Sequence, residues 1–335
     1  MKRRIVLVLI LGFTLIVAGS VLLWPISTHP NAQYPKGVYT IKEVQLKQQR
    51  MRVMIRSHQA GNPILLIIPD SFGASLGLYS QYLRTLEPYF TVVTFAYQGY
   101  HLQDTPLLEQ LRDDVMLLTD YIKKEVFADE VLLAGHGMGS VIAAEVLLAD
   151  TQSYLGYVGI AQYQDILQTQ VQVLAKLEEK AKPDSKQATQ IRTLQEEFAS
   201  KSFILKQEWL MKQKRPAMAF SYPVSKLHGM LFQSEQNGWE LLQYERLQKK
   251  LRPLWDQEML ATAWHLQQEL SVPCMLIGGR YDYIVPADHL LEEAELANCQ
   301  EAYFFDASAH FPHLEEESLF YQHVLDFYHK LKSEK

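Results

Sequence analysis

Apolar residues gather in short runs that alternate with helical patterns along much of the chain. Residues 64–68 form a continuous apolar run, which is typical of a strand buried on both faces. Residues 107–126 have the spacing of a long amphipathic helix. Strands that alternate with helices predict a parallel sheet with both faces covered. The predicted strands of this sheet are residues 64–68, 91–95, 131–134, 154–161, 272–277 and 302–305.

Two segments of the chain depart from this alternation. Residues 38–46 and 51–56 mix apolar and polar positions, which predicts a half-exposed antiparallel pair ahead of the parallel strands. Residues 162–265 contain no convincing strand pattern and are dominated by helical segments rich in Gln, Lys and Glu. We therefore expect one α/β domain that is interrupted by a helical insertion. The predicted helices of the insertion are residues 165–182, 184–201, 203–214 and 238–249.

The N-terminal segment predicts export. Three basic residues at 2–4 precede an uncharged run over residues 5–24, which as a helix would span about 30 Å, the thickness of a bilayer core. Positive charge at its start keeps that end cytoplasmic and places the following domain outside. A signal peptide cleaved after Ser20 is the rival interpretation, since Ala18 and Ser20 are suitably small. The apolar run continues beyond Ser20, which favours an uncleaved anchor, residues 1–24, followed by a proline-containing linker at 25–36.

The charge composition argues against nucleic acid as a partner. The formal net charge is −6 and the isoelectric point is about 6.0, so the chain lacks the basic surface that nucleic-acid binding requires. Cys274 starts one predicted strand and Cys299 precedes the next, so both lie at one edge of the sheet if those strands are neighbours. A disulfide is one outcome in an oxidising compartment. Two buried free thiols are the favoured expectation, because a domain of this size needs no cross-link.

A glycine-rich corner, G-H-G-M-G at residues 135–139, follows a predicted strand and opens an apolar helix. This is the frame of the nucleophile elbow, G-x-S-x-G, but Gly137 stands at its centre. An elbow residue has a strained backbone that costs a non-glycine residue about 1–3 kcal/mol, and glycine avoids most of this cost. Ser140 would be the nucleophile in a shifted register, but it falls in the first turn of the helix and points away. Gly135 and Gly139 fit the small flanking positions and fix the register.

From residue 37 to its end, the chain resembles α/β-hydrolases of the proline-iminopeptidase-like group. The resemblance implies an eight-stranded core with a helical cap over the active site, so that residues 37–161 and 266–335 form the core and residues 162–265 the cap. It also implies that Asp282 is a triad acid and His310 a triad base, each placed after a strand. The segments that carry the likeness are residues 64–75, the G-H-G-M-G corner, the helical insertion, G-G-R-Y-D-Y-I-V-P at 278–286 and S-A-H-F-P-H-L-E-E at 308–316.

The same resemblance implies an oxyanion site formed by the backbone N–H of Met138 and by the loop after the first buried strand. That loop usually reads H-G-G-P-G in the family, whereas this chain reads P-D-S-F-G at residues 69–73, with Ser71 and Phe72 at its centre. Asp70 would place a negative charge where an oxyanion has to form. The loop therefore opposes acyl-transfer catalysis.

A third departure lies at residues 94–99, where only Gly99 remains of a D-x-R-G-like motif of the family. Together with Gly137 and the altered loop, it indicates relaxed or redirected selection on the reaction. The sequence thus predicts an exported, membrane-tethered pseudo-hydrolase that binds a small ligand, a peptide or a partner without serine-nucleophile hydrolysis.

An active enzyme of altered mechanism is the alternative. In it, the Asp282–His310 pair would act with water or with Ser71 as a displaced nucleophile, in aminopeptidase-like hydrolysis or lyase-like proton transfer. No metal and no organic cofactor is expected in either case. The expected partners are a membrane, through residues 5–24, and a small molecule or peptide beneath the cap.

Overall fold

The computed structural model describes residue 19 and residues 35–70, 83–98, 100–163, 166–201, 238–261 and 270–334. The predicted anchor at residues 1–24 and most of the linker at 25–36 lie outside the described residues, apart from Gly19 and the last two linker positions. Within the ranges given above, no helix combines the length and the apolar character needed to cross a membrane.

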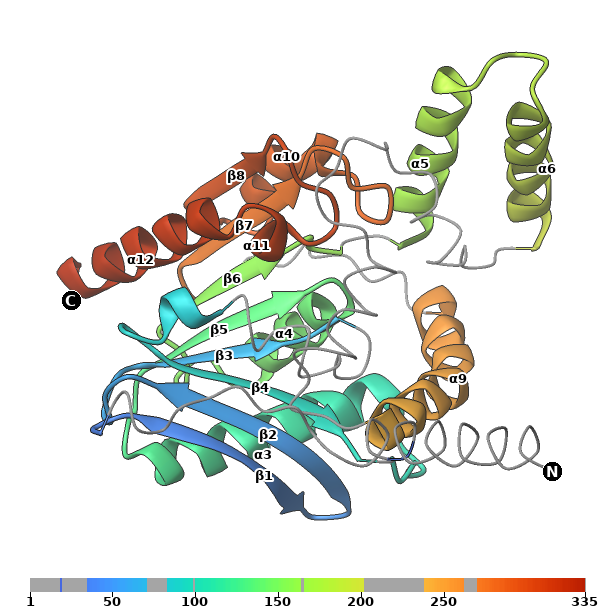
Figure 1. The fold of residues 1–335 in the computed structure, drawn as a ribbon. Coiled ribbons are helices and arrows are strands. Elements are labelled where there is room, and N and C mark those ends of the chain that lie inside the picture. The colour runs from blue at the N-terminus through green and yellow to red at the C-terminus, as the bar shows by residue number, and fades with distance from the viewer. Residues whose placement is uncertain are drawn as a thin grey trace, which may run out of the picture.

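One eight-stranded sheet forms the centre of the fold, in the order β1-β2-β4-β3-β5-β6-β7-β8 (Figure 1). Strands β1, β2 and β4 pair antiparallel, and all remaining neighbours are parallel. This confirms the predicted α/β-hydrolase architecture with a mostly parallel sheet. The strands are β1 (Val38–Leu46), β2 (Gln49–Ser57), β3 (Ile64–Ile68), β4 (Thr91–Tyr97), β5 (Val131–His136), β6 (Gly156–Ile160), β7 (Cys274–Gly279) and β8 (Glu301–Phe305).

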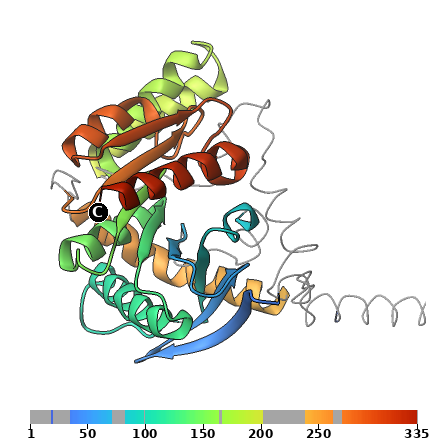
Figure 2. The ribbon, with the colours of Figure 1, turned by 90° about the vertical axis from the view of Figure 1, so that its left-hand side faces the viewer.

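Alternate residues of the central strands supply two hydrophobic cores, one on each face of the sheet. In β3, Leu66 belongs to one core and Ile67 to the other, so the strand is buried on both faces, as its continuous apolar run predicts. Figure 2 shows α3 and α12 on opposite sides of the sheet. The first face is covered by α3 (Leu107–Val126), α4 (Met138–Ala149), η2 (Ala287–His289) and α10 (Leu290–Leu296), and the second by η1 (Arg84–Leu86), α11 (Pro312–Glu315) and α12 (Glu317–Ser333).

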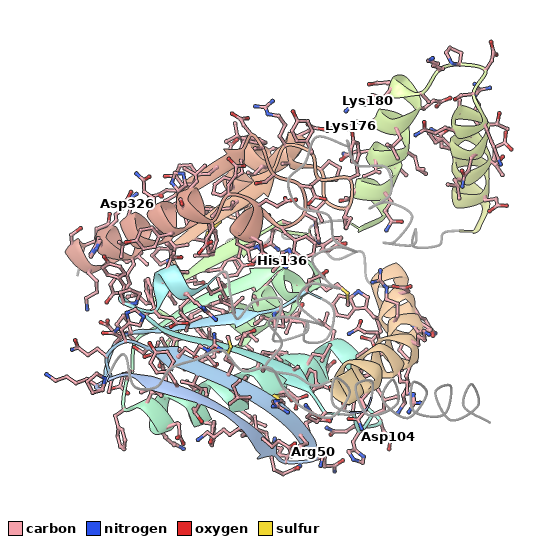
Figure 3. All side chains as sticks on the ribbon, in the orientation of Figure 1. Arg50, Asp104, His136, Lys176, Lys180 and Asp326 are labelled. Carbon is pink, nitrogen blue, oxygen red and sulfur yellow. A yellow bond between two sulfur atoms is a disulfide. The ribbon has the colours of Figure 1, made fainter. Side chains whose placement is uncertain are left out.

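The described part of the insertion consists of α5 (Ile166–Lys180), α6 (Lys186–Lys201) and α9 (Gly238–Ala261). The helix predicted at residues 203–214 lies outside the described residues. Helices α5 and α6 form a pair that projects from the core (Figure 1). Lys176 forms a 2.5 Å ion pair with Asp288, and Lys180 donates a hydrogen bond to the hydroxyl of Tyr283 at 3.1 Å. Both lysines lie on the side of α5 that faces the C-terminal half of the core (Figure 3).

Helix α9 is held against the core by one of its own carboxylates. Glu258 accepts hydrogen bonds from the backbone N–H groups of Leu107, at 2.5 Å, and Leu108, at 2.9 Å. These are among the first N–H groups of α3, which have no partner within the helix. Pro106 precedes them and offers no side-chain cap. A side chain of the insertion therefore satisfies the free N–H groups at the start of the core helix α3.

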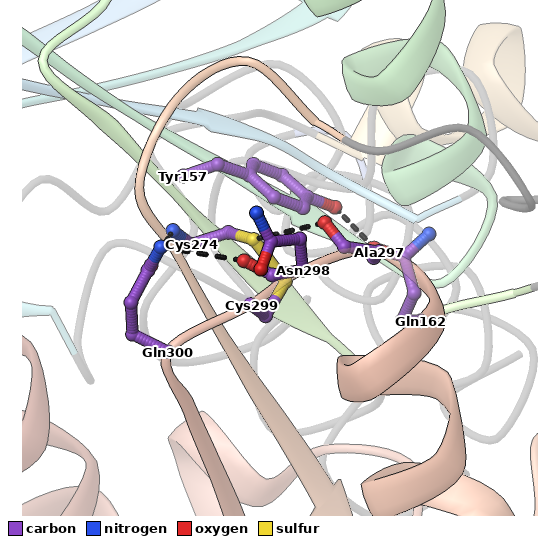
Figure 4. Close-up of a disulfide and its surroundings, with 7 residues drawn as sticks. All are labelled: Tyr157, Gln162, Cys274, Ala297, Asn298, Cys299 and Gln300. Carbon is purple, nitrogen blue, oxygen red and sulfur yellow. Dashed lines mark hydrogen bonds between the residues drawn. A yellow bond between two sulfur atoms is a disulfide. The ribbon is translucent and has the colours of Figure 1, made fainter.

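The expectation of two free thiols is wrong, because Cys274 and Cys299 form a disulfide (Figure 4). Their Cα atoms lie 4.6 Å apart. Cys274 opens β7 and the turn after α10 returns the chain to that point, where Gln300 donates from its backbone N–H to the Cys274 carbonyl at 3.0 Å. A cross-link of this kind limits the freedom of the unfolded chain and stabilises the fold by about 3 kcal/mol.

Candidate active site

The corner between β5 and α4 is built around Gly137, whose φ of 53° and ψ of −119° lie in a region that side chains rarely tolerate. Gly139 allows α4 to approach the sheet, since a Cβ at that position would lie 2.3 Å from the carbonyl oxygen of Ile68. The first turn of α4 therefore packs directly against the end of β3. This packing brings the residues that follow β3 next to Gly137.

The carboxylate of Asp70 occupies the space above Gly137. A Cβ added to Gly137 would lie 2.7 Å from Asp70 Oδ1 and 3.0 Å from His310 Nε2. Asp70 Oδ1 accepts a hydrogen bond from the backbone N–H of Met138 at 2.9 Å, and Asp70 Oδ2 lies 3.7 Å from His310 Nε2. The N–H group that the sequence assigned to the oxyanion site thus already binds a carboxylate of the protein.

Asp282 and His310, which follow two adjacent strands, are brought together at the same corner. His310 Nδ1 hydrogen-bonds Asp282 Oδ2 at 2.8 Å, and both side chains are buried. The other oxygen, Asp282 Oδ1, accepts from the backbone N–H groups of Ile284 at 2.7 Å and Val285 at 3.0 Å. Three hydrogen bonds therefore fix the carboxylate, and the carboxylate fixes the orientation of the imidazole.

The two carboxylates determine the protonation state of His310. Burial alone lowers the pKa of His310, but Asp282 and Asp70 outweigh burial and raise this pKa to about 10. Burial raises the pKa of Asp70, but His310, His136 and the Met138 N–H together hold it well below its ordinary value. At neutral pH the corner therefore holds an imidazolium between two carboxylates. A protonated His310 cannot accept a proton from a nucleophile.

Two further histidines support this corner, and the sequence had not indicated their role. His136 Nε2–H donates to the backbone carbonyl of His310 at 2.7 Å, and the rings of His136 and His313 lie 4.5 Å apart. Burial lowers the pKa of His136 to about 4 and that of His313 well below its ordinary value, so both are neutral at physiological pH. His136 lies in the interior at the end of β5 (Figure 3). The sequence signal for this role is a histidine at the end of a buried strand, directly before Gly137.

Of the two serines considered as nucleophiles, the structure describes only Ser140. Ser140 is buried, donates to the Gly137 carbonyl at 2.6 Å and accepts from the Tyr163 N–H at 3.0 Å, so its hydroxyl is engaged in the first turn of α4. Ser71 and Phe72 lie outside the described residues. Among the residues that the structure does describe, no cluster of three or more His, Cys, Asp or Glu side chains is arranged to hold a metal ion.

Residues 64–317 match the family described as having the alpha/beta hydrolase fold, and the chain belongs to this family. It is also similar to the "Probable aminopeptidase YbaC" of Bacillus subtilis (strain 168). The two are 28% identical over 316 residues, which cover 85% of this chain and 95% of that protein. The resemblance to α/β-hydrolases is therefore confirmed, and the relative named as a probable aminopeptidase supports the likeness to the proline-iminopeptidase-like group.

Solved structures show the same fold at low sequence identity. A proline iminopeptidase-related protein from Thermus thermophilus has a TM-score of 0.61 and 15% identity, over 88% of this chain and 98% of that one. The proline iminopeptidase of Mycobacterium smegmatis has a TM-score of 0.56 and 12% identity, over 87% and 98% of the two chains. The shared architecture places Gly137, His310 and Asp282 at the carboxyl end of the sheet, where such folds bind ligands.

Proposed function

We propose that this protein is a pseudo-hydrolase, which retains the α/β-hydrolase fold and binds a small ligand or peptide beneath its cap without forming an acyl-serine intermediate. One observation carries the proposal: the Asp70 carboxylate lies against Gly137, bonded to the Met138 N–H and paired with His310. It occupies the volume into which the side chain of an elbow nucleophile would extend.

Serine hydrolysis requires a nucleophile, a general base and an oxyanion donor, and this corner is unsuited to each of the three. Gly137 supplies no hydroxyl, His310 is protonated, and the Met138 N–H is engaged by a carboxylate. Loss of a single oxyanion donor costs about 10²–10³ in kcat. Sites without the nucleophile retain only about 10³–10⁴-fold catalysis over water, and that remaining rate depends on an open oxyanion site. Binding without acyl transfer is the function that fits these constraints.

The names of the relatives support one class of ligand, which we include in the same proposal. A relative named as a probable aminopeptidase and structural neighbours named as proline iminopeptidases favour a peptide or a compound resembling an amino acid. The Asp282–His310 pair is the feature that would serve the alternative, an active enzyme that uses water or Ser71. Its protonated imidazole suits it to donate a proton rather than to accept one.

Fluorophosphonate labelling tests this proposal directly. We expect the purified protein not to react, because Gly137 presents no hydroxyl to His310, while a serine hydrolase added to the same sample reacts fully. Ser71→Ala is the matched variant for the alternative. Labelling of the wild type that disappears in Ser71→Ala would contradict the pseudo-hydrolase. So would cleavage of aminopeptidase or ester substrates that is lost in His310→Ala.

We also propose that the domain is exported and remains attached to a membrane through residues 5–24. The basic residues before that apolar run and the Cys274–Cys299 disulfide support this location, since disulfides persist in oxidising compartments. Protease added to intact cells is expected to digest the domain, and the membrane fraction is expected to retain it beforehand. Full protection in intact cells, with digestion only after lysis, would contradict export.

A further inference from the structure

The loop that carries His310 is held by a carboxylate that follows it in the chain. Glu316 Oε2 accepts a hydrogen bond from the backbone N–H of Ala307 at 3.0 Å and another from the hydroxyl of Ser308 at 2.6 Å. Ser308 is buried, and a hydrogen bond to a carboxylate is stronger in such surroundings than in water. One oxygen atom therefore fixes two successive residues of the loop.

The single helical turn α11 brings Glu316 back toward this loop. The backbone N–H of Glu316 donates to the Pro312 carbonyl at 3.0 Å, which closes the turn. Glu315, the last residue of the turn, accepts a hydrogen bond from the backbone N–H of Ala309 at 2.5 Å. The direction from which Glu316 reaches the loop is therefore set by the backbone of the turn.

The same loop packs against the segment that carries Asp282. The Ser308 carbonyl accepts a hydrogen bond from the Tyr281 N–H at 2.9 Å, and Tyr281 directly precedes Asp282. Gly279 permits this approach, because a Cβ at that position would lie 2.0 Å from the Ala309 carbonyl oxygen. Ser308 thus connects the α11 turn to the segment that presents the Asp282 carboxylate.

The loop sets the distances between the His310 ring and two carboxylates. His310 Nδ1 lies 2.8 Å from Asp282 Oδ2, and His310 Nε2 lies 3.7 Å from Asp70 Oδ2. The other titratable groups that face the ring, His136 and His313, are neutral, so the two carboxylates determine its charge. The attraction between buried charges weakens with distance and with the entry of water. A loop that is free to move would therefore hold the proton of His310 less tightly.

We propose that Glu316 is a positioning residue, whose carboxylate oxygen Oε2 holds the His310 loop so that the imidazole meets both Asp282 and Asp70. Glu316 acts on the ring through the loop, because its two bonds go to residues two and three positions before His310. The consequence for the ligand rests on the binding function proposed above: Glu316 maintains the charged corner that a ligand beneath the cap would meet.

Titration of the His310 ring nitrogens by NMR in the full-length protein tests this role. The proton affinity of His310, whose pKa is about 10 in the wild type, is expected to fall about tenfold in Glu316→Ala, because the loop loses both bonds. Glu316→Gln is expected to keep the wild-type pKa of His310. Both bonds go to a single oxygen, and the amide oxygen of glutamine can accept them without the charge.

Glu317→Ala is the matched control for the loss of a nearby negative charge. Glu317 is the next residue, is also partly exposed, and accepts a hydrogen bond from the hydroxyl of Thr85 at 3.0 Å. This variant should leave the pKa of His310 unchanged. Ser308→Ala removes one of the two Glu316 bonds and no charge, and it should lower the pKa of His310 by less than Glu316→Ala does. It tests the proposal even if Glu316→Ala folds poorly.

An unchanged pKa of His310 in both Glu316→Ala and Ser308→Ala would overturn the assignment, and a lower urea midpoint alone would then indicate a purely structural role. Equal shifts in Glu316→Ala and Glu316→Gln, or in Glu316→Ala and Glu317→Ala, would overturn it as well, since they would show an effect of charge alone. Failure of the pseudo-hydrolase proposal has a different signature. Fluorophosphonate labelling of the wild type would end that proposal and leave the dependence of the His310 pKa on Glu316 intact.

Discussion

Gly137→Ser alone is expected to give a protein that is less stable than the wild type and still does not react with fluorophosphonate. The new side chain would enter a space in which Asp70 Oδ1 lies 2.7 Å from the Cβ position. It would also introduce the backbone strain of a positive φ, about 1–3 kcal/mol. The serine would meet a protonated His310 and an occupied Met138 N–H, so it would not be activated.

The double variant Gly137→Ser/Asp70→Gly is expected to react where the single variant does not. Removing the Asp70 carboxylate releases the Met138 N–H and the volume beside Gly137, and it leaves His310 paired with Asp282. His310 then has a lower pKa and can accept the proton of the serine hydroxyl. Labelling rates and urea midpoints of the wild type, both single variants and the double variant measure the effect.

Gly61→Ser is the matched control for stability. Gly61 has a φ of 85°, and a Cβ there would meet nothing within 4 Å, so this variant introduces backbone strain without a steric clash. We expect Gly137→Ser to lose more stability than Gly61→Ser, and Asp70→Gly to recover the difference. Equal labelling of Gly137→Ser and the double variant would show that Asp70 does not block the corner.

His310 is expected to carry protons on both ring nitrogens at pH 8. Burial lowers its pKa, but Asp282 and Asp70 raise it to about 10, against an ordinary value of about 6.5. Nitrogen-15 NMR of the histidine rings measures this state. The His136 ring, whose pKa burial lowers to about 4, should be neutral in the same spectrum and serves as an internal control. A neutral His310 at pH 8 would contradict the charged arrangement.

This charge makes stability depend on pH with a defined sign. A raised pKa means that the folded state binds the proton more tightly than the unfolded chain does. The stability contributed by His310 is fully present below pH 6.5 and is lost as the pH rises through about 10. The difference in unfolding free energy between the wild type and His310→Gln should shrink over that range. Asp70→Asn, which removes one carboxylate, should flatten the dependence.

Local sequence patterns predicted much of the secondary structure. The run at residues 64–68 and the helix at residues 107–126 were predictable because side-chain periodicity reflects burial within a single element. The disulfide was not predictable in the same way. Cys274 and Cys299 pair because β7 and β8 are neighbours and the turn after α10 returns to the start of β7, which depends on the path of the chain between them.

The sequence by itself determined the strand–corner–helix frame around Gly137 and the placement of Asp282 and His310 after consecutive strands. It also indicated the negative charge of Asp70 near the Met138 N–H. The tertiary structure decided that this carboxylate fills the corner and pairs with His310. It also decided that His136 holds the His310 backbone. The Asp70–Met138 and His136–His310 hydrogen bonds join residues 68 and 174 positions apart. Local periodicity does not record such contacts, because they are set by how separate strands pack into one sheet.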